Sequence, residues 1–199
     1  MSALSRQPWP MKWIALGIIL FIIPYTYLTL HYRKRTPAYL PYEDTRERIR
    51  AGHAGYQRIV GSIERPADPP QFWVGTTGAL AAGGLPEPLR TALGELLLLP
   101  ADIGRVKAAA AADHLAAYPV EFACTLADNR QQPEGVQFYV KDDALLIVPT
   151  CERLAGALIA RTREAVIVAT APPGSLPPGQ YQVTLVGRLG SRAWTLQVH

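Results

Sequence analysis

The chain has little cysteine, methionine and histidine: two, two and four among 199 residues. The two cysteines, Cys124 and Cys151, allow one disulfide at most, which excludes the disulfide framework of a small secreted domain. The two methionines, Met1 and Met11, lie near the N-terminus, which argues against a Met/His copper site in the rest of the chain. Neither cysteine belongs to a CxxC motif or has a histidine nearby, so a metal or redox pair is not expected.

The pairing of the cysteines stays open at this stage. Cys124 lies in an apolar run, and Cys151 directly follows another one. In an oxidising compartment a bridge between them would close a loop of about 27 residues and stabilise the fold by about 3 to 4 kcal/mol. The alternative is two buried free thiols that pack as small hydrophobic side chains.

The chain also lacks the short motifs of common catalytic and cofactor sites. HExxH, the P-loop, GxSxG and the dinucleotide-binding fingerprint are absent. Asp142 and Asp143 lie between two apolar runs, where aspartate favours a turn through its side chain. We therefore expect a protein that is not an enzyme and binds neither a cofactor nor a metal, although a site assembled from distant residues escapes a motif search.

Basic residues are concentrated in one part of the chain. Residues 1–60 contain nine Lys or Arg and three acidic residues, whereas the remainder contains eleven and thirteen. The excess positive charge therefore lies in residues 1–60, which anionic lipid headgroups would attract. Because the remainder is close to neutral and has no basic stripe, we expect no nucleic-acid binding.

A long uncharged run is the clearest feature that is present. WIALGIILFIIPYTYLTL, residues 13–30, is close to the roughly 20 residues that cross a bilayer as a helix. Proline is tolerated in such helices, and aromatic residues near both ends suit the headgroup level. The residues expected at the anchor and its interfaces are Trp13, Pro24, Tyr25, Tyr27, Tyr32, Arg33, Lys34 and Arg35.

A cleaved signal peptide is the alternative to an anchor. The run exceeds the usual 7 to 15 apolar residues, and no small-x-small cleavage site follows it, so we expect an uncleaved single-pass helix. A count of basic residues favours a cytoplasmic C-terminal side, but long domains translocate largely regardless of charge. Because Lys12 adjoins the run and the rest is β-rich, we expect an extracytoplasmic domain, against that count.

The sequence divides into residues 1–12 (N-terminal tail), 13–32 (transmembrane helix), 33–60 (basic juxtamembrane segment), 61–88 (Pro/Gly-rich connector) and 89–199 (globular domain). Short helices are expected over about 45–58 and 89–99. The first could lie on lipid headgroups or dock against a partner subunit, and a solvated charged linker is the alternative there. The alanine-rich run 107–117 is compatible with a helix or with a loop between strands. The connector contains one apolar group, Phe72, Trp73 and Val74, which we expect to pack on a surface as a docking element.

From residue 119 the apolar residues recur with the period of a strand. VEFACTL, GVQFYVK, ALLIV and AVIVAT are followed by GQYQVTLV and SRAWTLQVH. We expect the second and third of these to form a hairpin through Asp142 and Asp143, and the last two to form another. In the last hairpin the residues expected to face the core are Tyr181, Val183, Leu185, Trp194, Leu196 and Val198.

The closing segment LPPGQYQVTLVGRLGSRAWTLQV resembles the last strands of bacterial immunoglobulin-like and fibronectin-III-like domains, where a Pro/Gly turn leads into a tyrosine-bearing strand. The resemblance is at fold level, and the Cys-Trp-Cys order of antibody domains is absent because Trp194 follows both cysteines. It implies a mainly β protein with a C-terminal immunoglobulin-like β-sandwich from about residue 100. By analogy it also implies a docking or spacer role in the bacterial envelope.

These features predict a non-enzymatic, membrane-anchored accessory or structural subunit of a membrane protein complex. The helix, the connector and the β-sandwich would dock it, and its partners would be the lipid bilayer and other membrane protein subunits. The alternative is an anchored envelope binding module for a small molecule, a glycan or a peptide.

Overall fold

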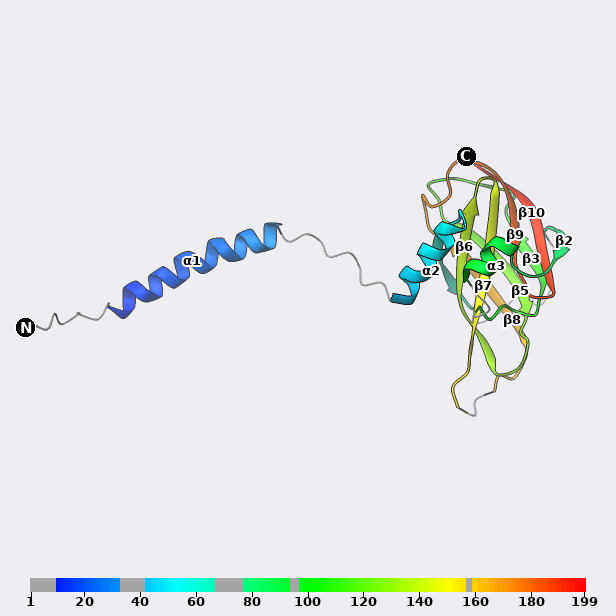
Figure 1. Ribbon diagram of the computed structural model, residues 1–199, viewed down its shortest axis with the longest axis horizontal. Coiled ribbons are helices and arrows are strands. Elements are labelled where there is room, and N and C mark those ends of the chain that lie inside the picture. The colour runs from blue at the N-terminus through cyan, green and yellow to red at the C-terminus, as the bar shows by residue number, and fades with distance from the viewer. Residues whose placement is uncertain (1–9, 33–41, 67–76, 94–96, 157–158) are drawn as a thin grey trace, which may run out of the picture. The chain divides into compact units, whose positions relative to one another are not determined.

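The computed structural model, drawn in Figure 1, describes residues 10–32, 42–66, 77–93, 97–156 and 159–199. Contacts divide the chain into two compact units, Met1–Pro41 and Tyr42–His199. In the described part, the first unit contains the helix α1 (Met11–Tyr32), and the second contains the remaining helices and all the strands.

Helix α1 confirms the predicted apolar helix. Its stretch Met11–Leu28 is long and apolar enough to cross a membrane, by length and composition. None of that stretch is buried against the rest of the chain. Pro24 lies inside the helix without ending it, as the sequence predicts. A signal sequence near the N-terminus passes the same test of length and composition.

The second unit consists mainly of strands. In chain order its elements are α2 (Tyr42–His53), β1 (Gln57–Glu64), β2 (Ala79–Ala82), α3 (Glu87–Leu93), β3 (Asp102–Ala108), β4 (Ala111–Ala112), β5 (Tyr118–Thr125), β6 (Gln131–Lys141), β7 (Ala144–Arg153), β8 (Glu164–Ala171), β9 (Gly179–Leu185) and β10 (Gly190–Val198). The prediction of a mainly β protein with a few short helices is therefore confirmed.

Eight of these strands form a closed barrel. Around the barrel the order is β10, β3, β5, β8, β1, β6, β7 and β9, and β9 pairs with β10 to complete the ring. The pairs β7–β9 and β10–β3 are parallel, and the other neighbours are antiparallel. The short strands β2 and β4 are added to β10. We call residues 42–199 the barrel domain.

The prediction of an immunoglobulin-like β-sandwich is wrong, and the resemblance to immunoglobulin-like and fibronectin-III-like domains does not hold. A sandwich has two sheets packed face to face, whereas here one sheet closes on itself. The difference arises at β1, which spans the expected boundary between residues 60 and 61. Because β1 pairs with β6 on one side and with β8 on the other, it fills a position that the sequence analysis left without a strand.

Both predicted hairpins are confirmed. β6 and β7 are antiparallel and joined through Asp142 and Asp143, where Asp142 has a φ of 51°. β9 is antiparallel to β10 along the whole length of β9, which pairs with the part of β10 from Arg192 to Val198. The six residues that were expected to face the core from this hairpin all belong to the buried cluster inside the barrel.

The short helices differ from the prediction in length. α2 ends at His53 instead of continuing to Arg58, because Gly55, with a φ of 81°, turns the chain into β1. α3 covers Glu87–Leu93, so it begins two residues before the expected start at 89, and residues 94–96 of the expected range lie outside the described residues. The alanine-rich run is not a helix, since its residues supply the end of β3 and the whole of β4.

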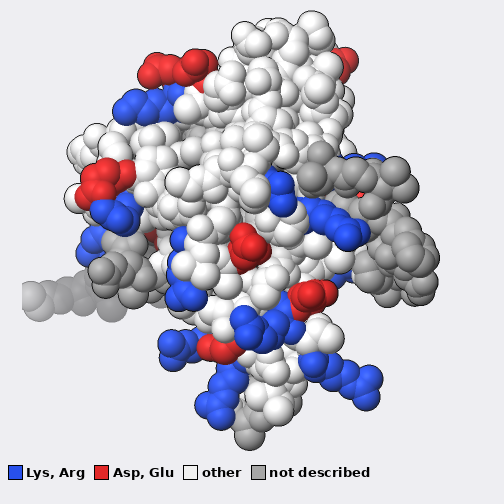
Figure 2. Space-filling view, turned by 90° about the vertical axis from the view of Figure 1, so that its right-hand side faces the viewer, with Lys and Arg blue, Asp and Glu red and all other residues white. Residues whose placement is uncertain are grey.

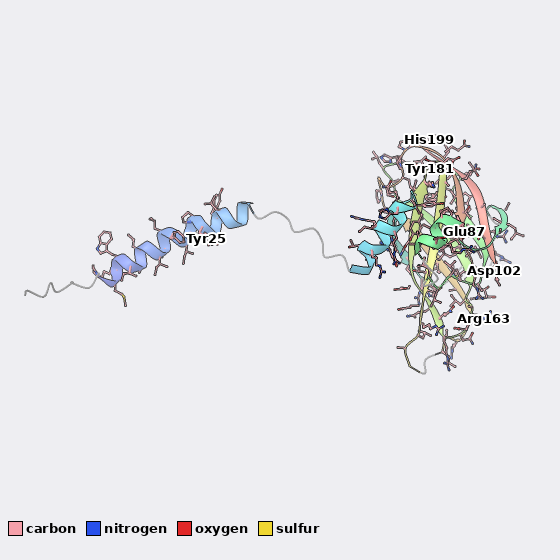
Figure 3. The ribbon with its side chains drawn as sticks, in the orientation of Figure 1. Tyr25, Glu87, Asp102, Arg163, Tyr181 and His199 are labelled. Atoms are coloured by element: carbon pink, nitrogen blue, oxygen red, sulfur yellow. The ribbon has the colours of Figure 1, made fainter. Side chains whose placement is uncertain are left out.

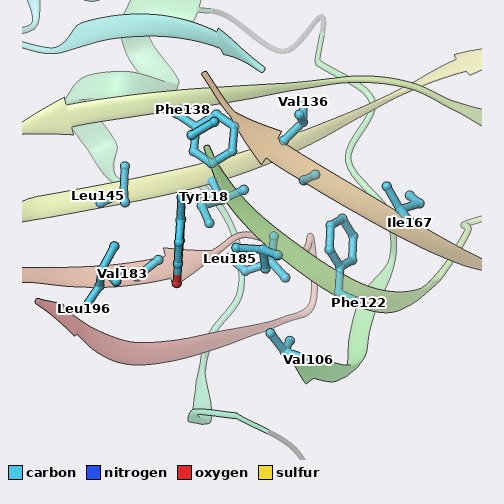
Figure 4. Packing of buried hydrophobic residues seen from close by; sticks show 14 of the residues in the cluster. Val106, Tyr118, Phe122, Val136, Phe138, Leu145, Ile167, Val183, Leu185 and Leu196 are labelled. Atoms are coloured by element: carbon cyan, nitrogen blue, oxygen red, sulfur yellow. The ribbon is translucent and has the colours of Figure 1, made fainter. Parts of the chain in front are cut away.

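All eight strands of the ring contribute side chains to the barrel interior, as Figure 4 shows for part of the cluster. Phe122 and Phe138 are fully buried there. An eight-stranded barrel has an interior just wide enough for side chains to fill. The interior is thus a packed core.

A second buried cluster lies on the outside of the barrel, under α2 and α3. From β7, Leu146 and Val148 belong to this outer cluster, while Leu145 and Ile147 belong to the inner one. Burial on both faces explains why ALLIV is an unbroken apolar run instead of an alternating one. α2 and α3 therefore cover one flank of the barrel.

We expect Gly61→Ala to destabilise the barrel domain by about 1 to 3 kcal/mol, the usual range for overpacking a core. A Cβ atom at Gly61 would lie 2.4 Å from the Phe138 ring and 2.8 Å from a methyl carbon of Val136. The matched control is Ser62→Ala at the exposed neighbouring position. Urea unfolding of the full chain in mild detergent, followed by circular dichroism, measures both. Equal midpoints for the two variants would contradict the placement of β1 in the barrel wall.

Candidate functional site

Polar groups inside the barrel are paired with each other. The Trp194 indole Nε1 donates to the Tyr118 hydroxyl at 3.2 Å, and that hydroxyl donates to the Ala109 carbonyl at 3.0 Å. Burial raises the pKa of Tyr118, an effect that the bond from Trp194 partly offsets. Throughout the described residues, every buried side-chain nitrogen and oxygen has a hydrogen-bond partner, and no group of three or more His, Cys, Asp and Glu residues is arranged to hold a metal.

The main charged cluster lies on the outside of the barrel, where α2 meets β1 and β6. Its centre is Arg58 on β1, whose side chain is only 4% exposed. Arg58 Nη2 lies 2.9 Å from Asp44 Oδ1 and 3.1 Å from Glu47 Oε2, both on α2. Arg58 Nε donates to Gln137 Oε1 on β6 at 3.0 Å. We call these four residues and Tyr139 the α2 junction.

Tyr139 completes the α2 junction from β6, where it lies opposite Arg58 in the ladder. Its hydroxyl donates to Gln137 Oε1, which also accepts from Arg58. Burial raises the pKa of Tyr139 to about 12; the Arg58 charge opposes this rise and the Glu47 charge adds to it. Tyr139 therefore stays protonated near neutral pH and acts as a hydrogen-bond donor.

Apolar contacts surround the α2 junction. Ala51 of α2 is fully buried and belongs to one cluster with Tyr56, Leu89 and Tyr139. Nearby, Lys141 Nζ lies 5.1 Å from the centre of the Tyr56 ring and donates to the Ala54 carbonyl at 3.3 Å. Charge pairing and burial together hold α2 against the barrel wall, so the α2 junction is a structural linkage.

Cys124 and Cys151 are free thiols in the structure, and both are buried in the cluster inside the barrel. Burial raises the pKa of Cys124 to about 12, and the neighbouring Cys151 adds to this rise. Burial also raises the pKa of Cys151 to about 11. Since the thiolate is the reactive form, both thiols are inert near neutral pH in the folded protein. Of the two alternatives, the structure has the free thiols.

The domain has a charge-poor surface at the end where the C-terminus lies. Figure 2 shows a largely white area in the upper middle of one face, with Lys, Arg, Asp and Glu side chains below it and at its upper edges. Two segments at this end, 109–118 and 172–178, are joined by hydrogen bonds from Gly174 N to His114 O and from His114 Nδ1 to Leu176 O. Figure 3 shows Tyr181 and His199 at the same end and Arg163 at the opposite one.

We call the exposed uncharged residues of these two segments the uncharged rim. They are Ala109, Ala110, Ala111, Leu115, Ala116, Ala117, Pro172, Pro173, Gly174, Pro177 and Pro178. Asp113, exposed beside Leu115, is the one Asp, Glu, Lys or Arg in the two segments. Leu115 is 76% exposed and is the largest apolar side chain in the rim.

The sequence-predicted site residues fall into separate groups. Trp13, Pro24, Tyr25 and Tyr27 lie on α1 with their side chains exposed, and Tyr32 is in its last turn. Phe21 stacks on Tyr25 with ring centres 5.9 Å apart. The predicted interface residues Arg33, Lys34 and Arg35 and the predicted docking residues Phe72, Trp73 and Val74 lie outside the described residues.

The α2 junction is the feature that sequence reasoning missed. Asp44 and Glu47 stood out for their capping-box spacing, but Arg58 was assigned to the same helix. One local pattern could have predicted β1. Gly55 favours a turn, and the residues that follow from Gln57 favour a strand. The burial of Arg58 depends on residues about 80 positions away, and no local pattern reports that.

We expect Arg58→Met to destabilise the barrel domain by about 2 kcal/mol, because Asp44 and Glu47 lose their common partner at the α2 junction. The two carboxylates are 39% and 33% exposed, which keeps the loss below that of a fully buried pair. Arg46→Met, at an exposed position of α2, is the matched control and should change stability little. Thermal unfolding in mild detergent measures both, and equal melting temperatures would show that the α2 junction does not stabilise the fold.

Comparison with family models, with curated proteins and with solved structures finds no match to this chain.

Proposed function

We propose that this protein is a non-enzymatic, membrane-anchored accessory or structural subunit of a membrane protein complex. α1 holds the chain in the bilayer, and the barrel domain contacts a neighbouring subunit.

The observation that carries this proposal is the bare apolar surface of α1. The helix has no charged residue between Trp13 and Leu30, and the stretch Met11–Leu28 is entirely unburied. Leaving so many large apolar side chains in water is unfavourable by about 25 cal/mol per Å². Placing the helix in a bilayer removes that cost along its whole length. The length of the apolar run also matches the thickness of the hydrocarbon core.

The uncharged rim supports contact with a neighbouring subunit. It combines an exposed leucine with alanines and prolines and lies on a domain whose interior is packed with its own side chains. The centres of protein interfaces are depleted in charged residues. The anchor also keeps the domain near other membrane proteins, and this high effective concentration strengthens a contact between them.

We also propose that the barrel domain lies on the extracytoplasmic side. Lys12 lies directly before the apolar run, and a basic residue there supports an anchor whose N-terminal side faces the cytoplasm. The basic residues after the helix favour the opposite orientation, but a domain of this size translocates largely regardless of charge.

A single exposed cysteine tests the anchor and its orientation in one preparation. Ser62→Cys introduces an exposed thiol on β1, whereas the native thiols are buried and inert. We expect the full-mass chain to stay in carbonate-washed membranes and a membrane-impermeant maleimide to label Ser62→Cys, but not the wild type, in right-side-out vesicles. Labelling that occurs only after detergent is added would show that the barrel domain lies on the cytoplasmic side. A shortened soluble chain would identify α1 as a cleaved signal sequence and contradict the anchor.

Purification from native membranes tests the proposed function itself. In mild detergent we expect defined membrane proteins to co-purify in constant proportion, as identified by mass spectrometry. Leu115→Arg in the uncharged rim should lower their yield about tenfold, the effect of losing one central apolar contact. Leu80→Arg, at an equally exposed leucine on β2, is the matched control. A protein that purifies alone, or equal losses in both variants, would contradict the proposed contact.

A further inference from the structure

The charges of α2 are balanced in sequence but separated in space. The helix YEDTRERIRAGH contains three acidic residues and three arginines. Asp44 and Glu47 face inward and are both paired with Arg58. The pairing leaves arginines on the side that faces away from the barrel.

We call Arg46, Arg48, Ile49 and His53 the outer face of α2. All four residues are exposed, and Ile49 is 55% exposed. Arg46, Ile49 and His53 follow the three- and four-residue spacing that places side chains on one side of a helix, whereas Arg48, two residues after Arg46, lies on the other flank of Ile49. Within the described part of the chain, neither Arg46 nor Arg48 makes a salt bridge. The outer face is therefore cationic with one apolar side chain at its centre.

The barrel holds this face in a fixed orientation. On the inward side of α2, Ala51 is fully buried and Asp44 and Glu47 are bound to Arg58. Figure 1 shows α2 on one flank of the barrel domain. Since the inward side cannot turn out without breaking these contacts, the outer face is presented permanently.

The sequence brings a bilayer within reach of this face. Residues 33–41 separate α1 from α2, and this length spans at most about 35 Å when fully extended. These nine residues contain Arg33, Lys34 and Arg35 and no acidic residue. The outer face thus follows closely after a helix of membrane-spanning length, in a stretch with added positive charge.

We propose that the outer face of α2 binds the anionic headgroups of the bilayer that holds α1, with Arg46 and Arg48 contacting phosphates and Ile49 entering the headgroup layer. Each basic residue near an anionic membrane surface raises binding about fivefold. Basic helices with an apolar side bind membrane interfaces in this way. Because α1 must be in a bilayer for this contact to form, the inference rests on the proposed function.

An anionic membrane fits the outer face better than an acidic protein surface does. With α1 in a bilayer, the nine intervening residues limit the distance between that bilayer and α2 to about 35 Å in every copy of the chain, which gives the headgroups a high effective concentration. A protein partner would have to be recruited separately. An acidic partner protein is accordingly the competing outcome of the test.

The experiment places an environment-sensitive fluorophore on α2 of the full chain. Ile49→Cys is labelled and reconstituted into phosphatidylcholine vesicles with about 30% phosphatidylglycerol, and spin-labelled headgroups serve as quenchers. We expect quenching in these vesicles, weak quenching in pure phosphatidylcholine, and loss of quenching at about 1 M salt, where the Debye length falls to about 3 Å. A probe at Thr195→Cys, exposed on β10 across the barrel, should be quenched less.

Charge variants identify the residues that carry the contact. Arg46→Gln with Arg48→Gln should weaken headgroup binding about 25-fold, two factors of five. The matched control is Arg105→Gln with Lys107→Gln, which removes two exposed positive charges from β3 and should leave quenching unchanged.

Vesicle flotation separates the two ways in which the experiment can fail. Chains that do not float with the vesicles overturn the proposed anchor and the headgroup contact together. Chains that float but show no lipid-dependent quenching at Ile49, equal effects of the two charge pairs, or quenching that requires an added partner protein leave the anchor intact and overturn the headgroup contact.

Discussion

The pairing of β1 with both β6 and β8 is the interaction on which the barrel domain depends. On the inner side of β1, Ile59 is buried in the core and Gly61 leaves room for the Phe138 ring. On the outer side, Arg58 binds the two carboxylates of α2. One strand therefore closes the sheet and also fixes the first helix of the domain. Removing it would open the ring between β6 and β8 and release α2.

The division between core and surface follows from that closure. An eight-stranded ring is narrow enough for its own side chains to fill it, so the described interior is a packed core with paired polar groups. On the barrel domain, the described features that stay exposed include the cationic outer face of α2 and the uncharged rim, and in the first unit the helix α1 is exposed along its length. A lipid bilayer, its headgroups and a neighbouring subunit are surfaces with the chemistry to contact them, which is why we propose an anchored accessory subunit.

Elements whose signal is local could be predicted from the sequence. α1 follows from an uncharged run, and the hairpins at Asp142 and Gly187–Gly190 follow from alternation and turn residues. The alternation of apolar and polar residues along a strand does not distinguish a β-sandwich from a β-barrel, because both folds bury one face of each strand. β1 was missed because its residues Arg58 and Gly61 resemble linker residues, and their roles depend on partners on β6 and α2. In the alanine-rich run, Ala111 and Ala112 form a strand that pairs with β10. This pairing outweighs the helix propensity of alanine.

Hydrogen exchange of the native full chain, read at the backbone amides of β1, tests this view most directly. If β1 closes the barrel, the β1 amides that donate into the ladders with β6 and β8 exchange only when the whole domain unfolds, with the protection seen for the barrel strands β6 and β8. Exchange of the β1 amides at the rate of exposed, unpaired backbone, while β6 and β8 stay protected, would contradict it. The barrel would then not be closed by β1.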